Sequence, residues 1–341
     1  MSFSITFEPS GRVFQAESSE TVLDAGIKAG LALPYGCKDG ACGSCKCKKI
    51  AGEVQHTAHQ EKALSVQEEA DGYVLTCCAK PLSDLVLESK QVGALGAFPV
   101  LKMPTRVASL KKVSDDVMII ELQLPAATEF KYHSGQYIEF ALTGGFKRAY
   151  SIANASHNGP FLELHIRHMP GGRFTDHVFA RMQNKEILRM EGPFGSFYLR
   201  EESQKPIVLL ASGTGFAPIK AILETMQHQS INRPVTLFWG GRRPADLYMN
   251  DWVENQKTLM PQLRYIPVIS NAQEQDAWKG ATGFVHQAVM QEFPDLSEHE
   301  VYACGAPIVV ESAQKDFVEL CGLHAENFFA DSFISEADKL R

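Results

Sequence analysis

The chain has 341 residues, with 33 Lys and Arg against 40 Asp and Glu, so its formal net charge is -7. That length is enough for about three domains with full cores, and the negative charge argues against a nucleic-acid partner. Residues 1–7 do not resemble a signal peptide and no apolar run is long enough to cross a bilayer, so we expect a cytoplasmic protein without membrane insertion.

Residues 1–90 are predicted to form an α+β domain. Thr21 precedes apolar helical positions and Gly30 would end that helix. Residues 91–104 hold glycines and prolines without periodicity, which predicts a linker. Alternating apolar residues predict strands at 4–7, 13–16, 45–50 and 73–76.

The cysteines of this first domain carry the most specific signal in the chain. Their spacing is C-x4-C-x2-C followed by a distant pair: Cys37, Cys42, Cys45, then Cys77 and Cys78. This is the thiolate pattern of a plant-type 2Fe-2S ferredoxin. A zinc site would more often use two C-x2-C pairs, and a disulfide framework is not expected without a secretion signal. The spacing therefore predicts a 2Fe-2S cluster, which moves single electrons. Cys47 is expected to pack inward from a strand.

The remaining chain reads as two further domains. Closely spaced short strands over residues 105–203 predict an antiparallel β-barrel with one helix at 173–180. From residue 204 to 341, apolar strands at 207–211, 235–239, 265–269 and 300–304 alternate with helices at 217–229, 284–292 and 309–321. That alternation predicts an α/β doubly wound nucleotide-binding domain.

A barrel strand carries Arg148-Ala-Tyr150-Ser151, and the strand before it begins Gly135-Gln-Tyr137. These segments resemble the ferredoxin-NADP reductase superfamily, where the motif is Arg-x-Tyr-Ser or Arg-x-Tyr-Thr. The resemblance implies FAD, with Arg148 on a flavin phosphate, Tyr150 over one face of the isoalloxazine and Ser151 hydrogen-bonding near N5.

The segment that follows matches the family's Gly-Gly-x-x-Ser/Thr element through Gly171, Gly172 and Thr175. It opens a helix whose free N–H groups suit the FAD pyrophosphate. His165 and Arg167 alternate on the preceding strand, which in relatives runs along the ribityl chain. His165 has an alternative interpretation as a buried, hydrogen-bonded structural residue.

The last domain carries the nicotinamide signals. Gly213, Thr214, Gly215 and Pro218 form a strand-to-helix turn that suits a dinucleotide pyrophosphate. After the next strand, Arg242 and Arg243 suit the 2'-phosphate of NADPH, whereas Asp246 suits the ribose diol of NADH. The resemblance to oxygenase-type relatives favours NADH.

The same resemblance assigns three further residues. Cys304, in the family's Cys-Gly-x-Pro segment, is placed beside the nicotinamide and flavin rings. Phe333 is chosen for the second flavin face, with Phe329 as the alternative. Cys77 takes the position of the cysteine in the family's Leu-x-Cys-Gln segment and becomes the fourth cluster ligand, with Cys78 as the alternative.

The resemblance covers essentially the whole chain and implies an NAD(P)H-dependent iron–sulfur flavoprotein oxidoreductase. Electrons would pass from NAD(P)H through FAD to the cluster and on to a partner oxygenase or deoxysugar dehydrase component. The cluster loop and the sequence of residues 211–215 favour the subgroup of CDP-6-deoxy-3,4-glucoseen reductases. A stand-alone flavin reductase or diaphorase is the alternative. An iron–sulfur redox sensor is a poorer one, because a sensor needs no nicotinamide domain.

Four lysines surround the cluster motif: Lys38, Lys46, Lys48 and Lys49. Lys46 and Lys48 alternate with Cys45 and Cys47, so we expect both lysines to be exposed. Exposed lysines here would steer an acidic electron acceptor, although a merely solvated strand face would look the same.

Overall fold

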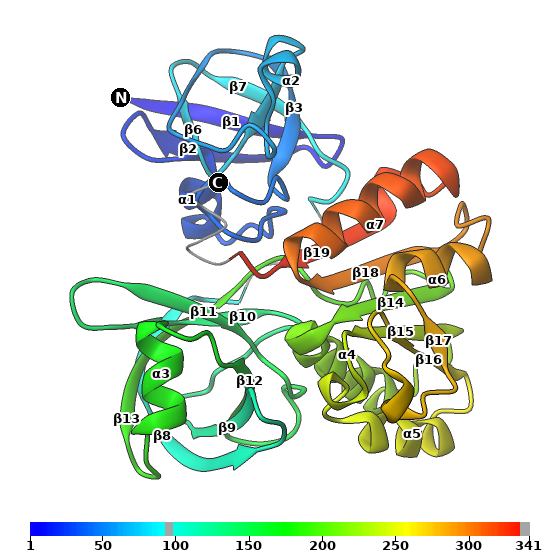
Figure 1. Ribbon diagram of the computed structural model, residues 1–341. Coiled ribbons are helices and arrows are strands. Elements are labelled where there is room, and N and C mark those ends of the chain that lie inside the picture. The colour runs from blue at the N-terminus through cyan, green and yellow to red at the C-terminus, as the bar shows by residue number, and fades with distance from the viewer. Residues whose placement is uncertain (93–97, 335–341) are drawn as a thin grey trace. The chain divides into compact units, whose positions relative to one another are not determined.

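The computed structural model describes residues 1–92 and 98–334 (Figure 1). The chain forms two compact units. Unit 1 contains the described residues up to Pro99 together with 332–334, and unit 2 spans Val100–Asp331. Within these described ranges, no helix combines the length and apolarity that a membrane span requires.

Unit 1 is built on a five-stranded sheet in the order β2-β1-β7-β3-β5. Its strands are β1 (Ser2–Glu8), β2 (Arg12–Glu17), β3 (Lys46–Ala51), β5 (Tyr73–Leu75) and β7 (Leu85–Glu88), with a small second sheet of β4 (Val54–His56) and β6 (Ala79–Pro81). Helix α1 (Val22–Lys28) begins where predicted, because the Thr21 hydroxyl accepts from the Asp24 N–H at 3.1 Å. The predicted strands are confirmed, whereas α2 (Val66–Ala70), β4, β6 and β7 were not predicted.

The first half of unit 2 is the predicted barrel, with strand order β11-β10-β13-β8-β9-β12. A bridge between Ile152 and Leu164 closes it, and α3 (Arg173–Ala180) packs on it. The strands are β8 (Leu101–Lys112), β9 (Val117–Gln123), β10 (Tyr137–Ala141), β11 (Lys147–Ser151), β12 (Phe161–Arg167) and β13 (Ile187–Phe194).

Strand β8 corrects the predicted linker of 91–104, because the strand already begins at Leu101. Met103 is buried and pairs with Met190 of β13, while Pro104 is exposed on the other side of the strand. Two prolines hid the alternation that the strand needs. Residues 93–97 of the predicted linker lie outside the described residues.

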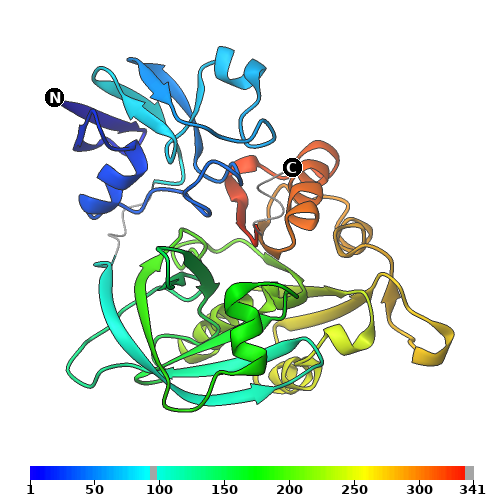
Figure 2. The same cartoon turned by 60° about the vertical axis from the view of Figure 1, so that its left-hand side comes forward.

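The second half of unit 2 is a six-stranded sheet in the order β17-β16-β15-β14-β18-β19, with parallel pairing from β17 to β18. Its strands are β14 (Ile207–Ser212), β15 (Val235–Gly241), β16 (Leu263–Ile269), β17 (Ala281–Thr282), β18 (Glu300–Gly305) and β19 (Phe328–Ser332). Helices α4 (Phe216–His228) and α5 (Asn250–Leu259) cover one face, and α6 (Val285–Glu292) and α7 (Pro307–Leu320) cover the other (Figure 1, Figure 2). The doubly wound prediction is confirmed; α5, β17 and β19 were not predicted.

A buried ion pair anchors the segment that joins the two halves of unit 2. Arg233 lies 2.6 Å from Glu300, and their side chains are only 3% and 6% exposed. The Arg233 guanidinium also donates to the carbonyl oxygens of Lys205 and Arg200, both at 2.8 Å. Arg233 therefore connects the joining segment to the start of β18.

Replacing Arg233 by Met should lower the free energy of unfolding by about 3–5 kcal/mol, because it leaves the buried Glu300 carboxylate without its charged partner. Chemical denaturation of the purified protein measures this. Lys257→Met is the matched control, since it removes an exposed ion pair to Glu254, and it should change stability by less than about 1 kcal/mol. Equal stability losses in both variants would contradict the assignment.

Candidate functional site

Four thiols of unit 1 lie as two pairs. The Cys45 Sγ is 3.2 Å from the Cys77 Sγ, and the Cys42 Sγ accepts from the Cys37 N–H at 3.4 Å. Among the described residues, no three metal-ligating side chains surround a single point. A tetrahedral zinc ion requires four ligands around one point, whereas a 2Fe-2S cluster distributes four thiolates over two irons. Two thiol pairs therefore fit the two-iron cluster.

The loop between α1 and β3 directs its backbone toward these sulfurs. The N–H groups of Cys37 and Ser44 donate to the Cys42 Sγ at 3.4 and 3.5 Å, and the Ala41 N–H donates to the Cys37 Sγ at 3.3 Å. Gly40 permits this path with a φ of +76°, in the left-handed region. Such N–H···S bonds stabilise thiolates and tune the potential of an iron–sulfur centre.

Two further cysteines lie near the loop. Cys47 is buried from β3, and burial raises the pKa of its thiol, as expected for a small apolar core residue. Cys78 lies next to Cys77 in a turn closed by its own N–H to the Leu75 carbonyl at 2.9 Å. The two adjacent sulfurs are 3.7 Å apart, and the Cys78 thiol also donates to the Ala58 carbonyl at 3.7 Å.

The lysines beside the cluster motif are not exposed as expected. Lys46 pairs with Glu68 at 2.5 Å and its side chain is 28% exposed. Lys48 is also half-buried, donates to the Asp71 carbonyl and lies 4.7 Å from the centre of the Tyr73 ring. The expectation that both lysines are exposed was wrong, because α2, which was not predicted, supplies a carboxylate that pairs with Lys46. Steering of an acidic acceptor by these lysines stays a prediction.

On β11 of unit 2, Tyr150 packs on an aromatic support. Its ring centre is 6.0 Å from that of Phe140 and 5.4 Å from that of Phe174. Burial raises the pKa of Tyr150, so its phenol is neutral. Arg148 lies two residues earlier and donates to the Lys147 carbonyl at 2.8 Å. This packing holds the Tyr150 ring in one orientation, as is needed for a ring that stacks on a flavin.

Ser151 and Cys304, which come from different halves of unit 2, meet at one carboxylate. The Ser151 hydroxyl donates to Asp331 Oδ2 at 3.0 Å, and the Cys304 Sγ is 3.9 Å from the same oxygen. All three residues are buried. Burial, with the Asp331 charge beside it, raises the pKa of Cys304, so this thiol stays protonated. Asp331 was not predicted as a site residue, because the resemblance assigned only aromatic residues of its segment.

The start of α3 is shaped by local contacts. The Thr175 hydroxyl donates to the Met169 carbonyl at 2.9 Å and accepts from the Met169 N–H at 3.2 Å. A Cβ at Gly172 would lie 2.8 Å from that carbonyl oxygen and Gly171 has a φ of +82°, so the turn requires both glycines. No side chain caps α3. Its first N–H groups are therefore available to a pyrophosphate.

The predicted nicotinamide turn is the 3₁₀ turn Gly213–Gly215, which leads directly into α4. Gly213 has a φ of +54°. A Cβ at Gly215 would lie 2.1 Å from the Cys304 carbonyl oxygen, so only glycine fits there. Thr214 of the turn and Pro218 of α4 are buried. The structure thus brings the glycine motif and the Cys304 motif into contact.

Of the three residues predicted to choose between NADH and NADPH, two are occupied by protein partners. Arg243 forms a two-pronged ion pair with Asp276 at 2.8 and 2.6 Å. Asp246 Oδ2 accepts from the N–H groups of Arg242 and Arg243 at 2.7 and 3.0 Å, and Oδ1 accepts from Arg167 at 3.1 Å. The Arg242 side chain is exposed. Asp246 therefore shapes the turn that presents Arg242.

His165 and Arg167 occupy the face of β12 that contacts the nucleotide-binding half. The His165 ring nitrogens lie 2.8 Å from the Tyr248 hydroxyl and 2.8 Å from Glu163 Oε1. Both nitrogens are thus engaged, as in the structural alternative. Arg167 pairs with Asp116 at 2.7 Å. Contact of either residue with a flavin stays a prediction.

The C-terminal aromatic residues differ in their surroundings. Phe329 is buried against Tyr302, with ring centres 4.8 Å apart, and the Arg200 guanidinium lies 4.4 Å from its ring centre. Phe329 is therefore a core residue. Phe333 follows β19, is partly buried and belongs to unit 1. Its role at the flavin stays a prediction.

Three family models match the chain in succession. Residues 5–82 match the 2Fe-2S iron-sulfur cluster binding domain, 104–198 the oxidoreductase FAD-binding domain and 209–315 the oxidoreductase NAD-binding domain. These matches agree with the thiol pairs, the barrel and the doubly wound sheet. The chain therefore carries a 2Fe-2S cluster, FAD and a site for NAD(P)H.

Relatives share this organisation over their full length. The CDP-6-deoxy-L-threo-D-glycero-4-hexulose-3-dehydrase reductase of Yersinia pseudotuberculosis is 38% identical, over 98% of this chain and 99% of the relative. Reductase component 1 of terephthalate 1,2-dioxygenase from a Comamonas species is 33% identical, over 98% of both chains. The crystal structure of the Amycolatopsis cytochrome P450 reductase GcoB superposes with a TM-score of 0.79 at 31% identity, covering 97% of this chain and 98% of that one.

The chain matches known proteins in the types of its domains, in their order along the sequence and in overall length. The matched domains are those of oxidoreductases, and the relatives are named as reductases or reductase components. The fold is that of ferredoxin-NADP reductase-like proteins joined to a ferredoxin domain. The chain belongs to the family of NAD(P)H-dependent iron–sulfur flavoprotein reductases, in which a 2Fe-2S domain precedes the FAD- and NAD-binding domains.

Proposed function

We propose that the chain passes electrons from NADH through FAD to its cluster and on to a separate protein acceptor. The meeting of Ser151 and Cys304 at Asp331 carries the proposal, because it joins the flavin motif to the nicotinamide motif in one buried place. FAD exchanges a two-electron hydride with the nicotinamide and single electrons with iron–sulfur centres. A cluster domain that receives electrons from such a flavin site can pass them singly to a one-electron acceptor.

The residues have distinct proposed roles. Asp331 orients the Ser151 hydroxyl toward the flavin edge, and the protonated Cys304 thiol fills the space beside the rings without adding a charge. Burial of all three excludes water from the transfer. The proposed cluster ligands are Cys37, Cys42, Cys45 and Cys77, and the proposed domains are 1–90, 105–203 and 204–341.

We propose a dehydrase component of deoxysugar synthesis as the acceptor, with an oxygenase component as the second candidate. The relative named for such a dehydrase is 38% identical, and the oxygenase relative is 33% identical. Purified acceptors of both classes, mixed anaerobically with the chain and NADH, test the choice. Faster NADH oxidation with an oxygenase component than with a dehydrase component would reverse the order of candidates.

The same assay separates these candidates from a stand-alone flavin reductase. Acceptor reduction should require the cluster and disappear when Cys42 is replaced by Ser. A stand-alone flavin reductase would supply its acceptor equally well without the cluster. We also propose that the protein works in the cytoplasm, where fractionation of cells should find it.

The nucleotide choice gives a separate prediction. Because Asp276 neutralises Arg243, Arg242 is the remaining candidate for a 2'-phosphate, and one exposed cation supports NADPH only weakly. Arg242→Ala should leave kcat/KM for NADH within about twofold and lower the smaller kcat/KM for NADPH by about three- to tenfold.

Asp246→Ala should lower kcat/KM for both nucleotides, since its carboxylate holds the turn through the N–H groups of Arg242 and Arg243. If instead only NADH efficiency falls, Asp246 binds the ribose diol directly. A parent chain that prefers NADPH would contradict the NADH proposal.

A further inference from the structure

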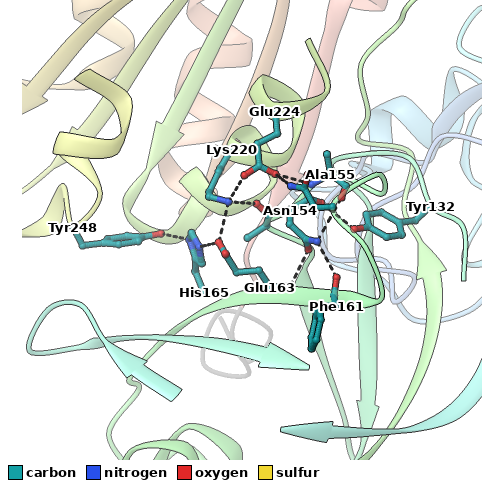
Figure 3. A network of polar contacts seen from close by, with 11 residues as sticks. Tyr132, Asn154, Ala155, Phe161, Glu163, His165, Lys220, Glu224 and Tyr248 are labelled. Carbon is teal, nitrogen blue, oxygen red and sulfur yellow. Dashed lines mark hydrogen bonds and ion pairs between the residues drawn. The ribbon is translucent and has the colours of Figure 1, made fainter. Parts of the chain in front are cut away.

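A polar network centred on Lys220 of α4 joins the two halves of unit 2 (Figure 3). The Lys220 Nζ donates to the Ala153 carbonyl at 3.2 Å and lies 3.1 Å from Glu163 Oε1 and 2.5 Å from Glu224 Oε1. Ala153 and Glu163 belong to the barrel half, whereas Glu224 lies on α4 with the lysine. An ammonium has three N–H donors. All three are therefore used, two of them across the interface between the halves.

Two further contacts cross the same interface, as Figure 3 shows. The second oxygen of Glu224 accepts from the Ala155 N–H at 2.8 Å. His165 lies 2.8 Å from Glu163 and, through its other nitrogen, 2.8 Å from the hydroxyl of Tyr248 in the nucleotide-binding half. These contacts therefore connect the two halves of unit 2 at several places, and the same charged residues, Glu163, Lys220 and Glu224, take part in more than one contact.

Lys220 and His165 are buried, and the side chains of Glu163 and Glu224 are 21% and 15% exposed. The Lys220 side chain is 5% exposed. Burial alone would raise the pKa of Glu163, but the hydrogen bond from His165 and the charge of Lys220 outweigh it and lower that pKa to about 2. Burial lowers the pKa of His165, so its ring is neutral. Glu224 faces both the Ala155 N–H and the lysine.

Lys220 and its partner Ala153 both lie close in sequence to a cofactor motif. Ala153 follows Ser151 by two residues, directly beyond the proposed flavin strand β11. Lys220 lies on the first turns of α4, the helix that the turn Gly213–Gly215 opens. The hydrogen bond from Lys220 to Ala153 is therefore a short connection between the flavin motif and the nicotinamide motif.

We propose that Lys220 is a positioning residue, which holds β11 at a fixed distance from the turn Gly213–Gly215 and so aligns the nicotinamide with the flavin. In the transfer, the C4–H bond of the nicotinamide breaks, a bond to flavin N5 forms, and the nicotinamide is oxidised as the flavin gains two electrons and a proton. A misplacement of about 1 Å lowers the rate of such an aligned step by about a hundredfold.

The test uses the full chain loaded with FAD. In Lys220→Met, the limiting rate of anaerobic flavin reduction by NADH should fall about ten- to a hundredfold, while FAD content stays at the parent level. The long-wavelength absorbance of nicotinamide stacked on flavin should weaken. Hydrogen exchange at the Ala155 amide should quicken, which reports the opened interface independently of turnover.

Two variants complete the experiment. Lys257→Met, which removes an exposed ion pair in the same half of unit 2, should behave as the parent in all three readouts, and Lys220→Arg should recover part of the reduction rate. If Lys220→Met does not fold, Glu163→Gln, which removes one charged partner of Lys220, should produce the same changes on a smaller scale. Parent-like flavin reduction together with faster Ala155 exchange, in whichever variant folds, would overturn the proposal and leave the network a purely structural one.

Discussion

Replacing Cys42 by Ser should remove the iron–sulfur cluster and leave NADH-dependent ferricyanide reduction within about twofold of the parent. The Cys42 Sγ accepts hydrogen bonds from two loop N–H groups and lies beside Cys37, so its replacement removes a proposed cluster ligand and these loop hydrogen bonds. Hydride transfer needs the FAD and nicotinamide motifs, which lie outside the cluster loop, and changes at independent sites seldom influence one another by more than a few tenths of a kcal/mol. Visible absorbance, iron content and ferricyanide reduction measure the outcome.

Cys47→Ser is the matched control, because Cys47 lies on β3 as a buried core residue and should not bind iron. It should retain the cluster, as should Cys78→Ser. Cys77→Ser should lose the cluster, because Cys77 is the thiol that pairs with Cys45. Loss of FAD and of ferricyanide reduction in Cys42→Ser would contradict the independence of the two electron-transfer steps. Loss of the cluster in Cys78→Ser but not in Cys77→Ser would transfer the ligand role to Cys78.

Arg148→Ala should weaken FAD binding by about ten- to a hundredfold, since a hydrogen-bonded charged group contributes about 1.5–3 kcal/mol. Tyr150→Ala should also weaken it, because it removes the ring that Phe140 and Phe174 hold in place. The dissociation constants for FAD, measured by flavin fluorescence after removal of the cofactor, give both values.

Conservative variants separate the two roles. Tyr150→Phe keeps the ring and should bind FAD nearly as the parent does. Arg148→Lys keeps the charge but loses the planar fork, so its affinity should fall between those of the parent and Arg148→Ala. Parent-like affinity in both alanine variants would contradict the assignment of the Arg-x-Tyr-Ser motif to the flavin.

The sequence predicted the fold well wherever periodicity was strong. The parallel strands of the last domain are continuous apolar runs, and α3 is found at the predicted residues. Elements with weak patterns were missed: α5 has only two buried residues, and β17 is two residues long. The predicted linker extended over the first residues of β8 because Pro104 masked the alternation of that strand.

For the site, motifs identified the residues but not their partners. Ser151 and Cys304 were found through local sequence patterns, but they lie 153 residues apart in the sequence and meet at Asp331. His165 was considered as a cofactor residue because the matching strand of relatives runs along the flavin ribityl chain, yet its ring bonds to Glu163 and Tyr248. Such long-range pairings depend on how two domains pack, which no local pattern encodes.

Anaerobic titration of the purified chain with NADH, followed by visible absorbance and electron paramagnetic resonance, tests the central claim most directly. We predict that the flavin absorbance is lost and that the signal of one reduced 2Fe-2S cluster per chain appears, with equal amounts of iron and acid-labile sulfide. Flavin reduction with no cluster signal, or the presence of zinc or a four-iron cluster in unit 1, would contradict the account.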